Sequence, residues 1–224
     1  MIHEFEKFSV EQLITGPWKE NCYIVKDRET NEAAIFDPGD DAPIIRESLG
    51  KLAGPVRHVM LTHGHYDHLL AAPEICNITS LPCTVHKDDI PLLRRAPIYA
   101  MAFEKRKIEI PDDIVGYDTS LRFKLGRHSV EILSTPGHTP GSVCLDFGDF
   151  ILSGDTLLHQ TIGRSDLPGG NDQSLNRSID LLLDKSDRDA VLLPGHGKPW
   201  LIGEAQDWWN DRQSTRNDQV EEVK

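Results

Sequence analysis

Four side chains of the types that bind metal ions lie within six residues, from His63 to His68. The segment that begins at Thr62 reads Thr-His-Gly-His-Tyr-Asp-His and directly follows an apolar run. His63 and His65 stand two positions apart, so their imidazoles point the same way on an extended backbone. Asp67 and His68 can then turn toward a second centre. Imidazole with carboxylate suits zinc, iron or manganese, and because the segment has no cysteine, a closed structural zinc finger is not expected.

Three further ligand-type residues follow one local pattern. His138 lies in Thr-Pro-Gly-His-Thr-Pro-Gly, Asp155 in Ser-Gly-Asp-Thr, and His196 in Pro-Gly-His-Gly. In each case an apolar run ends, a small residue opens a turn, and the ligand-type residue follows. Loops at strand ends often carry functional side chains on a rigid scaffold. The pattern therefore predicts that four strand ends meet at one metal centre.

Short strands mixed with helices are expected to position these loops in both halves of the chain. Runs rich in β-formers predict strands at 21–26, 32–36, 56–61, 83–86, 128–133, 142–147, 150–152 and 190–193, with a tight hairpin at Gly148 and Asp149. Helical spacing predicts helices from a cap at Asp40 or Asp41 to residue 52, at 69–76, from a cap at Asp172 to residue 183, and at 203–212. Residues 87–111 are expected to be partly helical and 217–224 to be frayed. This mixture predicts an α/β fold in which helices cover sheets.

The composition disfavours several classes of protein. The 224 residues carry a formal net charge of −12, and a nucleic-acid partner would require a basic face. The four cysteines form no C-x-x-C pair, so we expect reduced thiols rather than a disulfide framework. No window approaches the roughly 18 apolar residues of a membrane span, and the N-terminus has no apolar signal core. We therefore expect a cytoplasmic protein with a small-molecule substrate and no nucleic-acid or membrane partner; the sequence does not indicate its oligomeric state.

The complete ligand set resembles that of the metallo-β-lactamase superfamily. The resemblance rests on H-x-H-x-D-H together with His138, Asp155 and His196, and it extends from the strand at residue 21 to the final helix. Two segments, Gly-Arg-Ser-Asp-Leu-Pro-Gly-Gly from residue 163 and Leu-Ile-Gly-Glu from residue 201, resemble the short bacterial glyoxalase II-like (hydroxyacylglutathione hydrolase-like) branch. The resemblance implies an α/β four-layer αβ/βα sandwich, with two mixed sheets and outer helices. It also implies one such domain over residues 1–224, without a separate C-terminal helical domain.

The resemblance also implies a division of the ligands between two divalent metal ions. Site one would be His63, His65 and His138, site two would be Asp67, His68 and His196, and Asp155 would bridge the two. The ions are expected to be Zn²⁺, with Fe and Mn as alternatives. Two such ions activate a shared water as hydroxide, which would be the nucleophile, with Asp67 and Asp155 as the catalytic carboxylates.

The leaving group favours one class of substrate. A thiol has a pKa of about 8.5 and departs as thiolate without a dedicated acid, whereas an amine needs a proton. This favours an acyl thioester such as S-(2-hydroxyacyl)glutathione, as the resemblance also implies. Longer glyoxalase II enzymes bind glutathione through a C-terminal domain, but only 28 residues follow His196 here. The candidate substrate-binding residues are instead Tyr66, Lys87, Arg94, Arg95, Arg164 and Asp166, although Arg164 and Asp166 could also form an ion pair within their loop.

Three alternatives remain open at this point. A persulfide dioxygenase would bind a single iron through His63, His138 and Asp155, and would consume oxygen. A lactonase-type hydrolase would use the same metal chemistry as a thioesterase. A non-enzymatic scaffold on the same fold is a third alternative, but it would be expected to have lost ligands.

Overall fold

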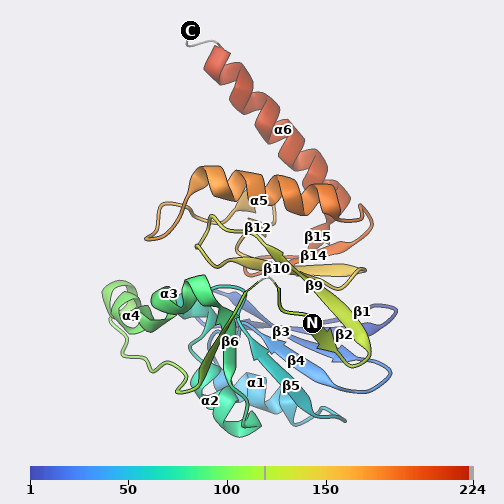
Figure 1. Ribbon diagram of the computed structural model, residues 1–224, viewed down its shortest axis with the longest axis vertical. Helices are drawn as coiled ribbons and strands as arrows, with labels where there is room; N and C mark the ends of the chain where they lie inside the picture. The colour runs from blue at the N-terminus through green and yellow to red at the C-terminus, as the bar shows by residue number, and fades with distance from the viewer. Residues whose placement is uncertain (119, 222–224) are drawn as a thin grey trace.

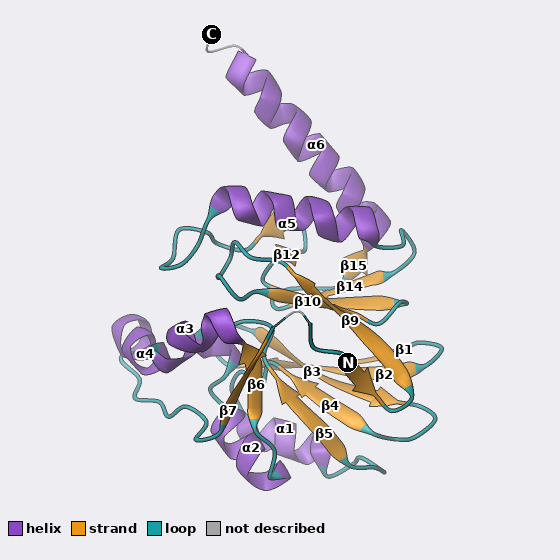
Figure 2. Ribbon diagram, in the orientation of Figure 1, coloured by secondary structure: helices purple, strands orange, loops and turns teal. Residues whose placement is uncertain are grey.

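Two β-sheets lie face to face, and helices cover their outer surfaces (Figures 1 and 2). The computed structural model describes residues 1–118 and 120–221, and the side chains of residues 1–118 and 120–215. The layers confirm the predicted α/β sandwich of two mixed sheets with outer helices. The prediction that residues 1–224 form a single domain stays a prediction.

The first sheet contains seven strands in chain order. They are β1 (Ile2–Glu4), β2 (Phe8–Thr15), β3 (Glu20–Asp27), β4 (Ala33–Phe36), β5 (Val56–Met60), β6 (Cys83–His86) and β7 (Ile114–Tyr117). The pairs from β1 to β4 are antiparallel, and those from β4 to β7 are parallel. The carboxyl ends of the parallel strands therefore lie together at one edge of the sheet.

The second sheet contains six strands in the order β15-β14-β11-β10-β9-β8. They are β8 (Phe123–Leu125), β9 (His128–Ser134), β10 (Val143–Asp146), β11 (Phe150–Gly154), β14 (Val191–Pro194) and β15 (Trp200–Leu201), and a separate ribbon pairs β12 (Leu157–Leu158) with β13 (Thr161–Ile162). The predicted hairpin joins β10 to β11, with Gly148 at φ 91°, a conformation that suits glycine. β11 and β14 are parallel, so their carboxyl ends also lie together.

Helices complete the outer layers and one end of the sandwich. They are α1 (Ala42–Leu49), α2 (Ala72–Thr79), α3 (Ile90–Arg94), α4 (Ala96–Glu104), α5 (Asp172–Lys185) and α6 (Ile202–Glu221), with 3₁₀ turns η1 (Tyr66–His68) and η2 (Lys87–Asp89). α1 and α2 cover the first sheet, α5 and the start of α6 cover the second, and α3 and α4 project at one end (Figure 1). The partly helical excursion predicted for residues 87–111 is confirmed.

Several helix boundaries differ from the predictions: α1 ends at Leu49 rather than at residue 52, and α2 spans Ala72–Thr79 rather than 69–76. Asn171, not Asp172, caps α5, because the Asn171 Oδ1 accepts a 2.8 Å hydrogen bond from the Ser174 amide. α6 runs to Glu221 rather than ending at 212, so residues 217–221 are helical instead of frayed, and residues 222–224 of that prediction lie outside the described residues. Asp41 precedes α1 as predicted, but its side chain makes no capping bond.

A central apolar core holds the two sheets together. Phe8 and Phe36 of the first sheet and Leu145 and Phe150 of the second are all almost completely buried in it. Separate clusters attach α1 and α2 to one sheet and α5 and α6 to the other. The four cysteines are free thiols, as predicted. Among the described residues, no helix combines the length and apolar character needed to cross a membrane.

Candidate metal centre

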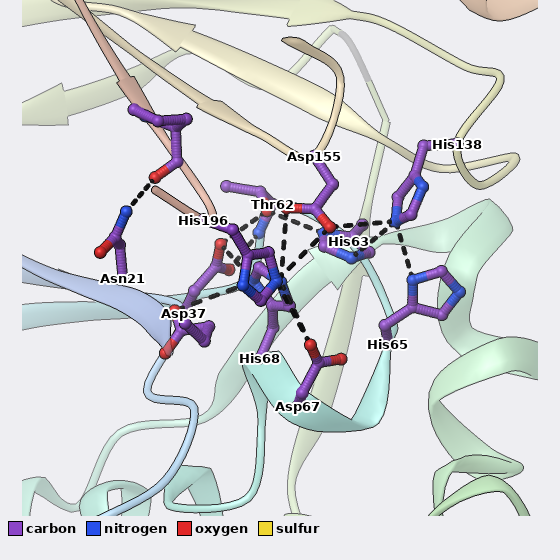
Figure 3. A network of polar contacts seen from close by, with 12 residues as sticks. Asn21, Asp37, Thr62, His63, His65, Asp67, His68, His138, Asp155 and His196 are labelled. Atoms are coloured by element: carbon purple, nitrogen blue, oxygen red, sulfur yellow. Dashed lines mark hydrogen bonds and ion pairs between the residues drawn. The ribbon is translucent and has the colours of Figure 1, made fainter. Parts of the chain in front are cut away.

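The seven predicted ligand residues meet where the ends of both sheets open on the same side (Figure 3). The loop after β5 carries His63, His65, Asp67 and His68. The loops after β9, β11 and β14 carry His138, Asp155 and His196. The loops are positioned by buried strands, so the expectation that four strand ends meet is confirmed by the geometry.

Three imidazoles form the first group. The His138 Nε2 lies 2.8 Å from the His65 Nδ1 and 3.2 Å from the His63 Nε2. His63 and His138 are almost fully buried. The three nitrogens converge from two loops that are 70 or more positions apart in the sequence.

Two imidazoles and a carboxylate form the second group. The His196 Nε2 lies 3.2 Å from the His68 Nε2 and 3.3 Å from the Asp67 Oδ2. Asp155 lies between the groups: its Oδ2 is 3.5 Å from the His138 Nε2 and 3.6 Å from the His196 Nε2, and its Oδ1 is 3.6 Å from the His68 Nε2. Asp155 is therefore the carboxylate that faces both groups.

The outer nitrogens of the imidazoles are held by acceptors. The His138 Nδ1 donates to the Arg164 carbonyl at 2.7 Å, and the His196 Nδ1 donates to the Trp18 carbonyl at 3.1 Å. A carbonyl can only accept, so these bonds place the proton on Nδ1 and leave the Nε2 lone pair directed into the site. Such outer partners orient metal-binding histidines.

Asp37 performs the same task for the other two buried histidines, and the sequence did not identify it. Its Oδ2 lies 3.1 Å from the His68 Nδ1 and accepts a 2.6 Å hydrogen bond from the Thr62 hydroxyl. Since that hydroxyl gives its proton to Asp37, it can accept from the His63 Nδ1, 3.0 Å away. The only sequence signal is a carboxylate at the end of β4, beside β5.

A second missed residue, Asp89, joins two ligand loops. Its Oδ2 accepts from the Gly64 amide at 2.8 Å and from the Thr139 hydroxyl at 2.6 Å, and its Oδ1 accepts from the Gly141 amide at 2.7 Å. The side chain is fully buried. Asp89 therefore fixes the loop of His63 and His65 against that of His138.

The electrostatics of the centre divide the histidines into two sets. Burial, followed by repulsion from His138, lowers the pKa of His65 to about 3, and burial also holds the pKa of His63 well below its usual value. Burial opposes a charge on His68 as well, but Asp155 and Asp37 raise its pKa well above the ordinary range. The carboxylates around His68 therefore favour a positive charge at that position.

The arrangement fits divalent cations. Imidazole lone pairs that converge at 2.8–3.2 Å repel one another unless a proton or a cation lies between them. The Asp155 Oδ1 is buried and has no hydrogen-bond partner. A side chain at Gly195 would place its Cβ 2.3 Å from that oxygen, so a glycine is required there. The donor set of nitrogen and carboxylate oxygen suits zinc, iron or manganese.

A cavity of about 270 Å³ opens above the two groups. Its lining includes Trp18, Tyr66, Leu92, Tyr99 and Phe103 from the first half of the chain, and Leu158, Ile162, Leu167 and Pro168 from the second. His65, Asp67, His138, Asp155 and His196 form its floor, and Gly163 and Arg164 complete the lining. A cavity of this size fits a small molecule.

The predicted substrate-binding residues divide between the cavity and the surface. Tyr66 and Arg164 line the cavity. Lys87, Arg94 and Arg95 are exposed and do not line it, and the Lys87 Nζ pairs with the Asp118 Oδ2 at 3.3 Å.

Asp166 also lies outside the lining. It holds Arg164 in a bidentate ion pair of 2.9 and 2.8 Å, so the alternative of an ion pair within the loop is confirmed.

Comparison with known proteins agrees with the fold and the site. The chain is 37% identical over 193 residues to an uncharacterized protein of Mycobacterium leprae, covering 82% of this chain and 88% of that one. It is 31% identical over 202 residues to the hydroxyacylglutathione hydrolase GloC of Haemophilus influenzae, covering 88% and 94% of the two chains.

Two solved structures at 30% identity superpose with TM-scores of 0.77. They are the B3 metallo-beta-lactamase BLEG-1, with 88% of this chain and 96% of that one covered, and TTHA1623 in a di-iron-bound form, with 86% and 95% covered. The family model of the metallo-beta-lactamase superfamily matches residues 15–196, which include all seven ligand residues. The chain therefore belongs to the metallo-β-lactamase superfamily.

Proposed function

We propose that the protein is a metal-dependent hydrolase that cleaves acyl thioesters. One divalent cation would be held by His63, His65 and His138, and a second by Asp67, His68 and His196, with Asp155 facing both. The observation that carries the proposal is the position of Asp155, whose two oxygens lie 3.5–3.6 Å from imidazoles of both groups. The similarity to the hydroxyacylglutathione hydrolase GloC supports a thioester substrate.

When bound, a pair of divalent cations lowers the pKa of a shared water and polarises a carbonyl. The residues of the chain prepare the site for this chemistry. Asp37 and the carbonyls of Arg164 and Trp18 orient the imidazoles from outside. Burial would raise the pKa of Asp67, but His68 and His196 hold it below its usual value, so the carboxylate is ionised at neutral pH and can orient a water proton. A thiolate can then leave without a proton donor, because its pKa of about 8.5 is close to neutrality.

The experiment combines metal analysis with hydrolysis of a thioester. We expect the purified protein to hold about two metal ions per chain and to hydrolyse acyl thioesters. Asp155→Ala should lose metal from both groups and lower kcat by at least about a hundredfold, because it removes the carboxylate shared by both. Glu47→Gln is the control, since Glu47 is an exposed carboxylate on α1. Full activity and full metal content in Asp155→Ala would contradict the proposal.

A β-lactam is a second candidate substrate. The similarity to BLEG-1, at 30% identity over 88% of the chain, favours it. The same purified protein should be assayed with a chromogenic cephalosporin, whose amine leaving group needs a proton. A kcat/KM for the cephalosporin above that for every thioester would favour lactam hydrolysis.

The assay also separates the alternatives that share the ligand types. A mononuclear dioxygenase would use His63, His138 and Asp155 and leave the second group without a role. One iron per chain with oxygen uptake would support it, whereas two metals without oxygen uptake would exclude it. A lactone substrate distinguishes a lactonase from a thioesterase under the same conditions.

A further inference from the structure

The described lining of the cavity above the metal centre lacks the free cationic side chains that the carboxylates of a glutathione thioester would require. Glutathione carries two carboxylates, whose transfer into a cavity needs cationic partners. Arg164 is the single lysine or arginine in the described lining, and its guanidinium already binds both oxygens of Asp166. Arg94 and Arg95 lie outside the lining. The two carboxylates of an acyl-glutathione would therefore lose hydration without gaining a free cationic side chain of the lining.

The walls instead offer apolar and aromatic surface. Tyr66 and Phe103 lie parallel, with ring centroids 6.5 Å apart and an interplanar angle of 11°. Trp18 and Phe103 line the cavity and are also 53% and 58% exposed, so the apolar wall continues from the metals to the mouth. Leu158 and Leu167 add aliphatic surface to the same lining.

The aromatic wall is clamped in place. The Trp18 Nε1 donates to the Glu104 Oε1, which joins the turn between β2 and β3 to the end of α4. Arg106 just beyond α4 binds both oxygens of Asp40. Two contacts therefore hold α4 against the body of the fold, and the wall is present before a substrate binds.

From this geometry we infer that the preferred substrate is a thioester with an apolar, uncharged acyl group, which the cavity binds, and that an acyl-glutathione is disfavoured. The inference rests on the proposed function. Each methylene buried against the wall should raise kcat/KM about fourfold, since its transfer from water gains about 0.8 kcal/mol. A cavity of about 270 Å³ is at the small end of ligand pockets, so the increase should stop at a medium chain length.

The test uses the metal-loaded protein with two sets of probes. The first set contains N-acetylcysteamine thioesters with acyl chains of increasing length, compared with S-lactoylglutathione. The second contains the corresponding S-alkyl thioethers, which are not hydrolysed, with binding measured by calorimetry. We expect kcat/KM and thioether affinity to rise with chain length, and every apolar thioester beyond the shortest to exceed S-lactoylglutathione.

A matched pair of variants locates the effect on α4. Phe103→Ala should lower kcat/KM for a six-carbon acyl chain about tenfold and leave a two-carbon chain within about twofold. Ile98→Ala removes an exposed apolar side chain of the same helix outside the cavity and should change neither.

The outcomes separate the inference from the proposed function. Thioester hydrolysis with no dependence on chain length, or with S-lactoylglutathione preferred, would overturn the inference and leave the function intact. Thioether affinity that rises with chain length, without hydrolysis of any thioester, would overturn the function and leave the apolar cavity supported.

Discussion

Asp89 belongs to neither group of candidate ligands, yet it accepts three hydrogen bonds from the loops that carry them. An asparagine in its place keeps the size but offers one acceptor oxygen and an amide that can only donate. We expect Asp89→Asn to weaken metal binding about 10–100-fold, as is typical of outer partners of metal ligands.

The measurement for Asp89→Asn is metal affinity by competition with a chromogenic chelator. Circular dichroism shows whether the variant is folded. Asp88→Asn is the control, because Asp88 is the neighbouring exposed carboxylate. Unchanged affinity in a folded Asp89→Asn would show that the loops hold their positions without this carboxylate.

The residues that converge at the candidate centre could be predicted from the sequence, but the groups that hold them from outside could not. His63, His138 and Asp155 each follow an apolar run and belong to a recognisable short motif. Asp37 and Asp89 have no such motif. Asp37 accepts a hydrogen bond from the Thr62 amide and Asp89 accepts one from the Gly64 amide, and the two residues of each pair are 25 positions apart in the sequence. Their roles depend on which strands lie side by side, and local pattern does not give that order.

At the scale of elements, the ion pair between Asp40 and Arg106 holds the end of α4 near the cavity. The hydrogen bond from Arg106 holds the pKa of Asp40 below its ordinary value of 3.8. A carboxyl group whose pKa is lower in the folded state than in the unfolded state stabilises the fold at pH values above its unfolded pKa. This stabilisation is lost as the pH falls through the folded pKa.

Asp40→Asn should therefore lower the free energy of unfolding at pH 7 by about 1 kcal/mol, a value discounted for solvent screening at the partly exposed Arg106. The difference should shrink as the pH falls below 3.8. Urea unfolding of both proteins across this range measures it, with Glu47→Gln as the control for an exposed pair. A difference that persists at the acid end would show that the charge of Asp40 is not responsible.

Long, strongly patterned elements were predicted more completely than short or polar ones. The stripe of Leu175, Ile179 and Leu182 identified α5, and all three residues are buried. β8, with three residues, was not predicted, because so short a run carries little periodicity. β2 was also not predicted, because its sequence alternates apolar and polar residues only over residues 8–11, and the buried Gln12 and the exposed Ile14 break the pattern.

The end of α6 shows a different limit. Ile202, Ala205 and Trp209 are buried against the second sheet and α5, and the Trp209 Nε1 donates to the Asp180 Oδ1 at 2.7 Å. Beyond Arg212 the sequence is polar, so no apolar stripe marks where the helix ends. The expectation of an end at 212 placed the boundary where the packing stops, whereas the helix continues to Glu221.

At the scale of the whole molecule, the candidate metal centre lies where the two sheets meet, so we expect metal binding to be coupled to folding. Glu20 and Asp37 are buried beside His68, and burial raises the pKa of Glu20 well above its usual value. Ligands that bind only the folded state stabilise it. Removal of the metals with a chelator should lower Tm by about 5–10 °C at metal concentrations near a hundred times Kd.

Differential scanning fluorimetry with and without the chelator measures this shift. Adding back zinc should restore the original Tm. An unchanged Tm, on protein whose metal loss is verified by mass spectrometry, would show that the centre contributes nothing to folding stability.

The most direct test of the two-site account is metal content in three purified proteins. Wild type should hold about two metal ions per chain, and His138→Ala and His196→Ala should each retain about one, because the two histidines belong to different groups. Mass spectrometry of the metals, with protein concentration determined on the same samples, gives the ratio. Equal and unchanged occupancy in both variants, or a single iron in the wild type, would contradict the account.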